Sequence, residues 1–333
     1  MRLLVTGGAG FIGSHLCDLL VEQGDSVHVL DDLSTGSAAN VAQLEGCEGF
    51  RFTVGSVADE EVVDELVREA DVVVHLAAAV GVKLVVESPV RAIETNVHCT
   101  EVVLAHADRH GKPVLLASTS EVYGKSSALP FREDGDLQMG ATDKSRWAYA
   151  CSKAIDEFLA MAYWRERDLP VIVVRLFNTV GPRQTGSYGM VVPTLVGQAL
   201  AGEPLTVYGD GRQTRCFCHV ADVVRALAGL IDDERARGNV FNVGATAEIS
   251  MLDLARRIID VTDSSSEVSL TTYADAYGDG FEDMFRRIPD IAKVRGLIGW
   301  SPTRSLDDVI RDVVEHQRAL EPTVVRSDVV SSE

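Results

Sequence analysis

Short apolar runs alternate with amphipathic segments through the first half of the chain. The runs RLLVTG, DVVVHLAAA, PVLLAST and PVIVVRLF are apolar at most positions, as strands buried on both faces require. Between them, apolar residues recur at helical spacing in SHLCDLLVEQG and DEEVVDELVREA, over about residues 90–110, and in SRWAYACSKAIDEFLAMAYWRERD. This order predicts an α/β protein built on a Rossmann-type, doubly wound parallel sheet.

The regular alternation ends after the fourth of these runs, where loops, short strands and helices follow one another. We expect residues 1–177 to form an NAD-binding Rossmann domain, to which a later segment of about 213–245 returns. Residues 178–320 are expected to form mainly a smaller C-terminal substrate-binding lobe, and residues 321–333 a frayed tail. Within this lobe, the patterns SMLD and SLDD each predict a helix that begins with a capping box.

Composition and charge narrow the class of protein. The chain has 333 residues, 46% of them hydrophobic, and a formal net charge of −19, which argues against binding to nucleic acid or to an anionic membrane. Its six cysteines have no CxxC spacing, which is typical of reduced core cysteines in a cytoplasmic protein. Residue 1 leads directly into a strand and no apolar run reaches membrane-spanning length, so we expect neither a signal peptide nor a membrane segment.

The sequence VTGGAGFIGSHL joins the first strand to the first helix and contains Gly7, Gly10 and Gly13. Glycines at this spacing make a tight turn, let a pyrophosphate approach the backbone and let the helix pack on the strand, while the helix N-terminus faces the phosphates. Asp31 ends the second strand, where an acidic side chain binds the adenosine ribose hydroxyls and repels a 2′-phosphate. The pattern therefore predicts a dinucleotide site that prefers NAD to NADP.

Tyr149 and Lys153 are spaced i, i+4 in a long predicted helix, and therefore lie on one helix face. An ammonium beside a phenol stabilises the phenolate and lowers the tyrosine pKa. A phenolate can take the proton of a hydroxyl group while a hydride leaves the same carbon. Downstream of a dinucleotide site, this pair predicts the oxidation of an alcohol.

These motifs together resemble the extended short-chain dehydrogenase/reductase family, in its NAD-dependent nucleotide-sugar epimerase/dehydratase branch. The resemblance covers nearly all of the chain up to residue 320 and rests on TGGAGFIGSH, Asp31, HLAA, STSEVYG, Tyr149 with Lys153, RLFNTVGPR, YGDGRQTRCFCHV and RRIPD. It implies a tightly held NAD, a second lobe that binds a nucleoside diphosphate sugar, and a reaction that begins by oxidising C4 of the sugar. Relatives pair through two long helices, so the resemblance also implies a homodimer.

The resemblance assigns catalytic and cofactor roles to individual residues. Thr119 matches the residue that hydrogen-bonds the C4 hydroxyl, Tyr149 the base and Lys153 the residue that binds the nicotinamide ribose. Besides Tyr149 and Lys153, the positions implied to bind NAD are Gly7, Gly10, Phe11, Ile12, Gly13, Asp31, Ser34, Thr35, Gly36, Ser56, Val57, Leu76, Ala77, Ala78 and Asn96. Ser56 departs from the family, which usually has an Asp there for the adenine, and leaves Val57 to pack on the ring.

The resemblance also implies a substrate site in the second lobe. Arg215 and Arg287 match the arginines that clamp the diphosphate, and Tyr208 matches a residue that lines the nucleotide pocket. The positions implied to bind the nucleotide sugar, with UDP favoured as the nucleotide, are Lys83, Asn178, Arg183, Tyr208, Arg215 and Arg287. No metal site is predicted.

Glu121 bears on which reaction of this family the chain performs. Simple C4 epimerases usually carry a small polar residue at this position, since their 4-ketose needs only rotation and hydride return. A carboxylate suits a reaction with a further proton to move: dehydratases use such a Glu at C5, and UDP-glucuronate decarboxylases carry the same Thr-Ser-Glu as residues 119–121. Ser120 stands where dTDP-glucose dehydratases usually have an Asp, although GDP-mannose dehydratases share the Thr-Ser-Glu.

Two further stretches resemble UDP-glucuronate decarboxylases. The stretch KSRWAY and the RCF of residues 215–217 are similar to the aminoarabinose-pathway enzymes, and PLTVYGDGRQTR is similar to UDP-xylose synthases. Lys144 and Arg146 are close to Tyr149, and each either meets a C6 carboxylate or belongs to a solvated helix start. Our hypothesis is NAD-dependent decarboxylation of UDP-glucuronate. The alternatives are a UDP-glucose or UDP-glucuronate C4 epimerase, a nucleotide-sugar dehydratase, and a non-catalytic NAD-binding protein.

Overall fold

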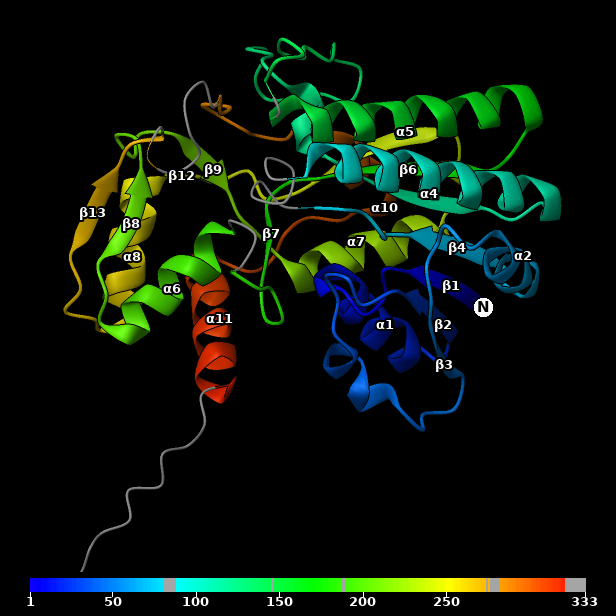
Figure 1. Cartoon of the computed structure of the whole chain (residues 1–333), viewed down its shortest axis with the longest axis horizontal. Helices are drawn as coiled ribbons and strands as arrows, with labels where there is room; N and C mark the ends of the chain where they lie inside the picture. Colours follow the sequence, from blue (N-terminus) through cyan, green and yellow to red (C-terminus); the bar gives the residue numbers. More distant parts are fainter. Residues whose placement is uncertain (81–87, 145, 187–189, 274, 276–281, 321–333) are drawn as a thin grey trace, which may run out of the picture.

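The structure, a computed structural model, combines a central sheet with a smaller group of helices and short strands (Figure 1). It describes residues 1–80, 88–144, 146–186, 190–273, 275 and 282–320. Lys83 and the tail predicted over residues 321–333 lie outside the described residues. Within those ranges, no helix combines the length and the apolar character needed to cross a membrane.

The central sheet has seven strands in the order β11-β6-β5-β4-β1-β2-β3, and every neighbouring pair is parallel. The strands are β1 (Arg2–Thr6), β2 (Ser26–Asp31), β3 (Phe50–Val54), β4 (Val72–His75), β5 (Val114–Thr119), β6 (Val171–Leu176) and β11 (Asn239–Val243). The predicted doubly wound parallel sheet is confirmed. The strand order reverses between β1 and β4, and ligands of such sheets bind beyond the carboxyl ends of the strands at this point.

The register brings the carboxyl ends of the central strands to one edge of the sheet. Thr6 of β1 is paired with Leu30 of β2 and with His75 of β4. Thr119 of β5 is paired with Leu176 of β6. The residues that follow these positions in the chain therefore meet along a single edge, although they come from distant parts of the sequence.

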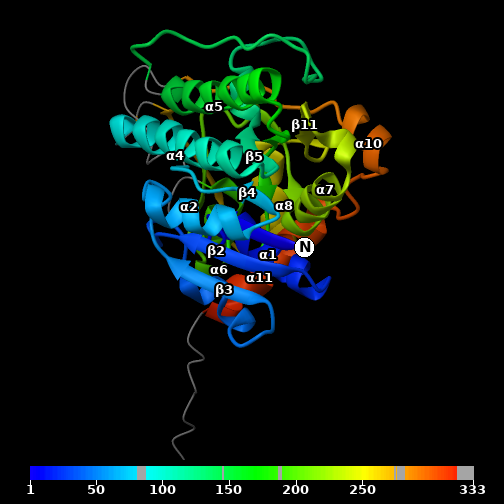
Figure 2. The same cartoon turned by 90° about the vertical axis from the view of Figure 1, so that its right-hand side faces the viewer.

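Helices cover both faces of the sheet. In Figures 1 and 2, α4 and α5 lie side by side on one face with α2, and α1 and α7 pack together on the other. These helices are α1 (Phe11–Glu22), α2 (Glu60–Glu69), α4 (Pro89–His110), α5 (Arg146–Arg167) and α7 (Val220–Asp232), and the short α10 (Ala292–Ile298) contacts α7 and β11. Both α7 and β11 fall within the segment of about 213–245 that the sequence predicts to return to the sheet.

A second apolar cluster forms the core of the smaller lobe, on the left in Figure 1. It lies among α6 (Val191–Ala201), α8 (Met251–Thr262), α11 (Leu306–Leu320) and the strand β8 (Leu205–Tyr208), which pairs with β13 (Val268–Thr271). Two further short pairs are β9 (Thr214–Cys216) with β12 (Glu248–Ser250), and β7 (Thr179–Val180) with β10 (Cys218–His219). The remaining short turns of helix are η1 (Ala38–Asn40), η2 (Ala42–Leu44), η3 (Ser120–Tyr123) and η4 (Glu234–Ala236).

The helix starts of the smaller lobe follow the predicted capping patterns. The amide of Asp253 donates to the hydroxyl of Ser250 at 3.1 Å, and the amide of Asp308 donates to the hydroxyl of Ser305 at 3.2 Å. Each hydroxyl thereby satisfies one of the N–H groups that an α-helix leaves unpaired at its start.

β4 ends earlier than its apolar run predicts. The run DVVVHLAAA extends to residue 79, whereas β4 ends at His75. Beyond it, the amide of Leu76 donates to the carbonyl of Thr6 at 3.1 Å and the amide of Ala77 to the Thr6 hydroxyl at 3.4 Å. The backbone is thus held against the end of β1, and its small apolar residues form part of a cavity wall.

Candidate active site

A cavity of about 1620 Å³ runs along the carboxyl edge of the sheet and reaches into the smaller lobe. Most of the predicted site residues line it: Gly7, Gly10, Phe11, Ile12, Gly13, Asp31, Ser34, Thr35, Ser56, Val57, Leu76, Ala77, Ala78, Thr119, Glu121, Tyr149, Lys153, Asn178, Arg183, Tyr208, Arg215 and Arg287. Gly36 and Asn96 do not line it, and Lys83 lies outside the described residues. Residues implied to bind NAD and residues implied to bind the sugar thus share one space.

The glycine loop is packed too closely to carry side chains. Gly7 has a φ of +72°, and a Cβ there would lie 2.7 Å from the backbone nitrogen of Ala77. A Cβ on Gly13 would lie 2.7 Å from the Cα of Gly8, so any side chain would push α1 away from the loop. Gly10 is the N-cap of α1, and the first residues of this helix line the cavity. This geometry fits a pyrophosphate at the helix start.

Asp31 ends β2 at the same edge and is held in place by the backbone. The amide of Ala9 donates to its Oδ2 at 3.0 Å and the amide of Leu33 to its Oδ1 at 2.8 Å. Burial raises the pKa of Asp31, and these two backbone hydrogen bonds act in the opposite direction. Gly36 lies behind it, since a Cβ there would be 3.0 Å from Asp31 Oδ1. Asp32, which the sequence analysis does not predict, also lines the cavity.

Asn96 supports the cavity from behind. Its Oδ1 accepts a hydrogen bond from the amide of Ala79 at 2.7 Å, and its Nδ2 donates to the Ser152 hydroxyl at 3.1 Å. With 1% of its surface exposed, Asn96 joins the loop after β4 to α4 and α5. Asn96 thus holds the loop and does not line the cavity, and its predicted contact with NAD stays a prediction.

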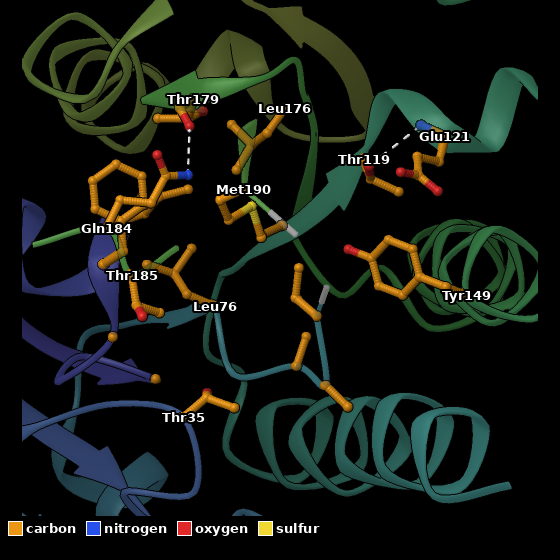
Figure 3. A pocket seen from close by; sticks show the side chains of 18 of the residues that line it. Thr35, Leu76, Thr119, Glu121, Tyr149, Leu176, Thr179, Gln184, Thr185 and Met190 are labelled. Atoms are coloured by element: carbon orange, nitrogen blue, oxygen red, sulfur yellow. Dashed lines mark hydrogen bonds between the residues drawn. The ribbon is translucent and has the colours of Figure 1, made fainter. Parts of the chain in front are cut away.

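The catalytic residues predicted from the sequence meet at one end of the cavity. Figure 3 shows Thr119, Glu121 and Tyr149 grouped there, with the Tyr149 hydroxyl directed into the open space. Thr119 is the last residue of β5, and its hydroxyl accepts the amide of Glu121 at 3.3 Å, which starts the turn η3. Tyr149 and Lys153 lie on the first turns of α5, on the side that faces β5.

The surroundings of Tyr149 oppose its ionisation. Burial raises the pKa of the Tyr149 hydroxyl well above its usual value, and the Glu121 carboxylate raises it further. A hydrogen bond with Thr119 lowers the pKa, but less than burial raises it. A cationic group bound in the cavity, such as the oxidised nicotinamide of NAD, would act in the same direction as Thr119 and favour the phenolate.

Glu121 lies between two buried arginines. Its Oε2 is 3.1 Å from Nη1 of Arg146, and its Oε1 is 3.3 Å from Nη1 of Arg287. Arg146 and Arg287 are 5% and 8% exposed. Of the two roles that the sequence leaves open for Arg146, the solvated helix start is therefore excluded. Lys144 differs, because it is partly exposed and pairs with Asp143 at 3.6 Å.

Asp283 joins the arginines into one cluster, and no sequence motif predicts its presence there. Its carboxylate is 2.8 Å from Nη2 of Arg215, 3.4 Å from Nη2 of Arg146 and 4.0 Å from Nη2 of Arg287. Burial lowers the pKa of Arg287 to about 10, and the charge of Arg215 contributes to this shift. Three cations thus share two carboxylates, which leaves the cluster a net positive charge in a chain of charge −19. Arg287 lies four residues from Asp283, whereas Arg146 and Arg215 come from distant segments that only the fold brings to it.

The other predicted substrate residues lie along the same cavity, apart from this cluster. Asn178 donates to the carbonyl of Cys216 at 3.1 Å, and the ring of Tyr208 lies 6.4 Å from that of Tyr273. Arg183 is 2.7 Å from Asp18 of α1, so it connects the smaller lobe to the sheet side of the cavity. Across the described residues, no group of three or more His, Cys, Asp or Glu side chains could hold a metal ion.

Comparisons with known proteins agree with the motifs. The family model of GDP-mannose 4,6-dehydratase matches residues 4–313. The chain is 40% identical over 321 residues to UDP-N-acetyl-alpha-D-glucosaminuronate decarboxylase of Bacillus cytotoxicus, covering 96% of this chain and 98% of that protein. It is 36% identical to UDP-glucuronic acid decarboxylase 1 of Xenopus tropicalis, over 95% of this chain and 72% of that protein.

Solved structures agree as well. The UDP-glucuronic acid 4-epimerase of Bacillus cereus, crystallised with UDP-4-deoxy-4-fluoro-glucuronic acid and NAD, matches with a TM-score of 0.87 at 27% identity. The match covers 96% of this chain and 100% of that one. The family predicted from the sequence motifs is therefore confirmed.

Proposed function

We propose that this chain, which belongs to the GDP-mannose 4,6-dehydratase family of NAD-dependent nucleotide-sugar enzymes, decarboxylates a UDP-linked uronic acid after oxidising its C4 hydroxyl. One observation carries the proposal: a carboxylate, Glu121, lies in the cavity with Tyr149 and is paired with the buried Arg146 and Arg287. A C4 epimerase of neutral sugars does not require this arrangement. Its 4-ketose intermediate only rotates in the site before the hydride returns to C4. The names of the two decarboxylase relatives support the same choice.

The end of the cavity beside the glycine loop fits NAD. Gly7 and Gly13 leave room for a pyrophosphate at the start of α1, and the fixed carboxylate of Asp31 suits the adenosine ribose hydroxyls. When bound there, NAD supplies the hydride acceptor for C4 of the sugar. Lys153 would hold the nicotinamide ribose, and its charge favours the Tyr149 phenolate.

Oxidation at C4 requires a base in contact with the hydroxyl group. Tyr149 takes the hydroxyl proton as the hydride leaves the same carbon, while Thr119 hydrogen-bonds the oxygen and orients it. For a uronic acid, the product is a β-keto acid: the C4 carbonyl is separated by C5 from the C6 carboxylate. Such an acid loses CO₂ readily, since the electrons of the broken C5–C6 bond pass to the C4 oxygen.

The second step explains why Glu121 and its arginines lie where they do. The electrons that reach the C4 oxygen are stabilised by the hydroxyls of Tyr149 and Thr119. C5 then takes up a proton, which Glu121, in the cavity with Tyr149, would relay from water. The hydride removed in the first step would then return to C4, and Tyr149 would give its proton to the C4 oxygen, which yields the pentose and restores NAD. Arg146 attracts the C6 carboxylate despite the negative charge of the chain, and Arg215 and Arg287 are available to the diphosphate, as the resemblance implies.

A second substrate is favoured by a specific observation. The relative from Bacillus cytotoxicus, at 40% identity, is named for a uronate with a 2-acetamido group. We therefore keep UDP-N-acetylglucosaminuronate beside UDP-glucuronate as a candidate. Both carry the C4 hydroxyl and the C6 carboxylate that the proposed chemistry requires, so one mechanism serves both.

The test is a proton NMR assay of the purified protein with NAD and separate UDP-sugars. With UDP-glucuronate or its 2-acetamido form, we expect release of CO₂ and conversion of the uronate to the corresponding pentose. UDP-glucose, which has no C6 carboxylate, is the matched control and should stay unconverted. Inversion at C4 of any of these sugars without loss of CO₂ would identify an epimerase, and loss of water from UDP-glucose a dehydratase.

We further propose that the protein is a homodimer of the cytoplasm. α4 and α5 expose the large apolar side chains of Val90, Ile93, Ile155 and Phe158, at 66%, 40%, 50% and 69% of their surface. A second copy of the chain, pairing through the same two helices, would cover them. All six cysteines are free thiols, which suits a reducing compartment.

A further inference from the structure

Lys153 has a buried ion-pair partner, Asp156, one turn further along α5. The Lys153 Nζ lies 2.8 Å from Oδ2 of Asp156. Their side chains are 3% and 0% exposed, so the pair is almost completely removed from solvent. Asp156 belongs to none of the family motifs on which the site was predicted.

Stability alone is a poor explanation for this pair. Replacing a buried ion pair with apolar side chains of similar volume is often neutral or stabilising, because both charges lose their hydration on burial. Oδ1 of Asp156 has no hydrogen-bond partner among the described residues, which adds to the cost of keeping a carboxylate there. We therefore expect Asp156 to act through Lys153, which lines the active-site cavity.

We propose that Asp156 is a positioning residue, which holds the Lys153 ammonium against the cavity wall and offsets part of its positive charge at Tyr149. This role rests on the proposed function, in which Lys153 and Tyr149 carry out the oxidation at C4. Asp156 thereby sets the pH range in which Tyr149 acts as a base, without touching substrate or cofactor itself.

The charges around Tyr149 shift its pKa in the direction that this role requires. Burial raises the pKa of Tyr149 most, the charge of Glu121 raises it next, and the charge of Asp156 raises it as well. Thr119 and Arg146 lower it. Removing the Asp156 charge therefore leaves Lys153 uncompensated and lowers the Tyr149 pKa.

The neighbours of Asp156 oppose the effect that burial has on its ionisation. Burial raises its pKa, while Lys153 on α5 and the hydroxyl of Thr100 on α4 lower it. Thr100 is in turn 3.3 Å from Nε2 of the buried His75 on β4. The titratable groups that face Asp156 are Lys153, Glu157 and Tyr149 of α5 and Cys99 of α4.

Asp156→Asn tests the proposal. A base acts when it is deprotonated, so the rate of C4 oxidation rises with pH through the Tyr149 pKa. We expect the acid limb of the pH profile of kcat/KM to move to lower pH by about one unit, the effect of removing a nearby partly screened charge. The second readout needs no substrate. The tyrosinate absorbance of the NAD complex is followed against pH, and the curve of the same variant carrying Tyr149→Phe is subtracted. The midpoint of the difference curve should move to lower pH by the same amount.

Matched variants separate this role from a structural one. Asp222→Asn removes an equally buried carboxylate, 1% exposed, on α7, and should lower the melting temperature without moving either pH curve. Asp156→Glu keeps the charge and should restore the wild-type curves. If Asp156→Asn does not fold, Asp156→Ser, which leaves room for a water molecule, should show the same shift.

An Asp156→Asn or Asp156→Ser enzyme that loses stability and rate equally at every pH, with unshifted tyrosinate absorbance, would overturn the proposal. That outcome is distinct from a failure of the proposed function. A protein that inverts C4 instead of releasing CO₂ still uses Tyr149 and Lys153, so both curves can be measured with its preferred sugar.

Discussion

Glu121 and its two arginines show how single residues tune this site. The charge of the carboxylate raises the pKa of Tyr149, which opposes formation of the phenolate that the first step needs. Arg146 and Arg287 limit this effect by pairing with it at 3.1 and 3.3 Å. Because Glu121 opposes the oxidation step, we expect it to act in the step that follows oxidation.

Glu121→Gln is expected to separate the two steps. Glutamine keeps the shape and one acceptor but cannot exchange a proton, so oxidation at C4 should continue while the later step stalls. Adding UDP-uronate should then produce the absorbance band of trapped NADH with little final product. Glu248→Gln, which changes a carboxylate paired with Arg286 at the surface, is the control and should turn over normally. Rapid C4 inversion by Glu121→Gln, with no CO₂ released, would contradict the decarboxylase reading.

Asp31 is expected to decide between the two nicotinamide cofactors. Its carboxylate is fixed by the amides of Ala9 and Leu33 and cannot turn away from a 2′-phosphate. We expect strong preference for NAD over NADP in a fluorescence titration, and a marked loss of that preference in Asp31→Ser. Equal affinity of the native protein for both cofactors would show that the adenosine ribose lies elsewhere.

At the scale of elements, α5 must be held in register with β5 for Tyr149 to face Thr119. A buried network does this: Glu157 of α5 accepts hydrogen bonds from Ser118 of β5 and, at 2.8 to 3.1 Å, from Arg175 of β6. The guanidinium of Arg175 also lies over the ring of Tyr123, 4.7 Å from its centre. One helix and two strands are thereby tied together directly beneath the catalytic residues.

Arg175→Met should test this link. It leaves the buried Glu157 without a counter-charge, so we expect the free energy of unfolding to fall by about 3 kcal/mol. Urea denaturation measures this change. Arg132→Met removes an exposed partner of Asp134 and should cost less than about 1 kcal/mol. Equal losses in the two variants would mean that the buried network does not hold α5.

At the scale of the whole molecule, α4 and α5 expose apolar side chains that the rest of the described chain does not cover. These helices pack against each other and run along one side of the sheet (Figure 2), so a second copy could continue the layer. Ile93 and Ile155 of this surface also line the cavity. The core of the smaller lobe lies among α6, α8 and α11, so pairing through α4 and α5 would leave the lobe free.

Phe158→Glu is expected to give a monomer. A charge at the centre of an apolar contact has no partner there, so the dimer should dissociate while the fold remains. Light scattering coupled to gel filtration measures the mass. Phe285→Glu is the matched control, since Phe285 is 63% exposed, close to the 69% of Phe158, but lies on neither helix. A native protein of monomeric mass would refute the proposed dimer.

The sequence by itself determined the features that depend on near neighbours. The order of strands and helices follows from the periodicity of apolar residues. The dinucleotide loop follows from three closely spaced glycines, and the shared helix face of Tyr149 and Lys153 follows from their i, i+4 spacing. Only the tertiary structure decided the partners of Glu121, because Arg287 is 166 residues away along the chain and reaches it through the folding of the smaller lobe. The same holds for Asp283, whose partners Arg146 and Arg215 come from distant segments, and for Asn96, which the fold places behind the cavity. Periodicity reports which side of an element is buried, whereas the identity of a buried charge's partner depends on packing between elements.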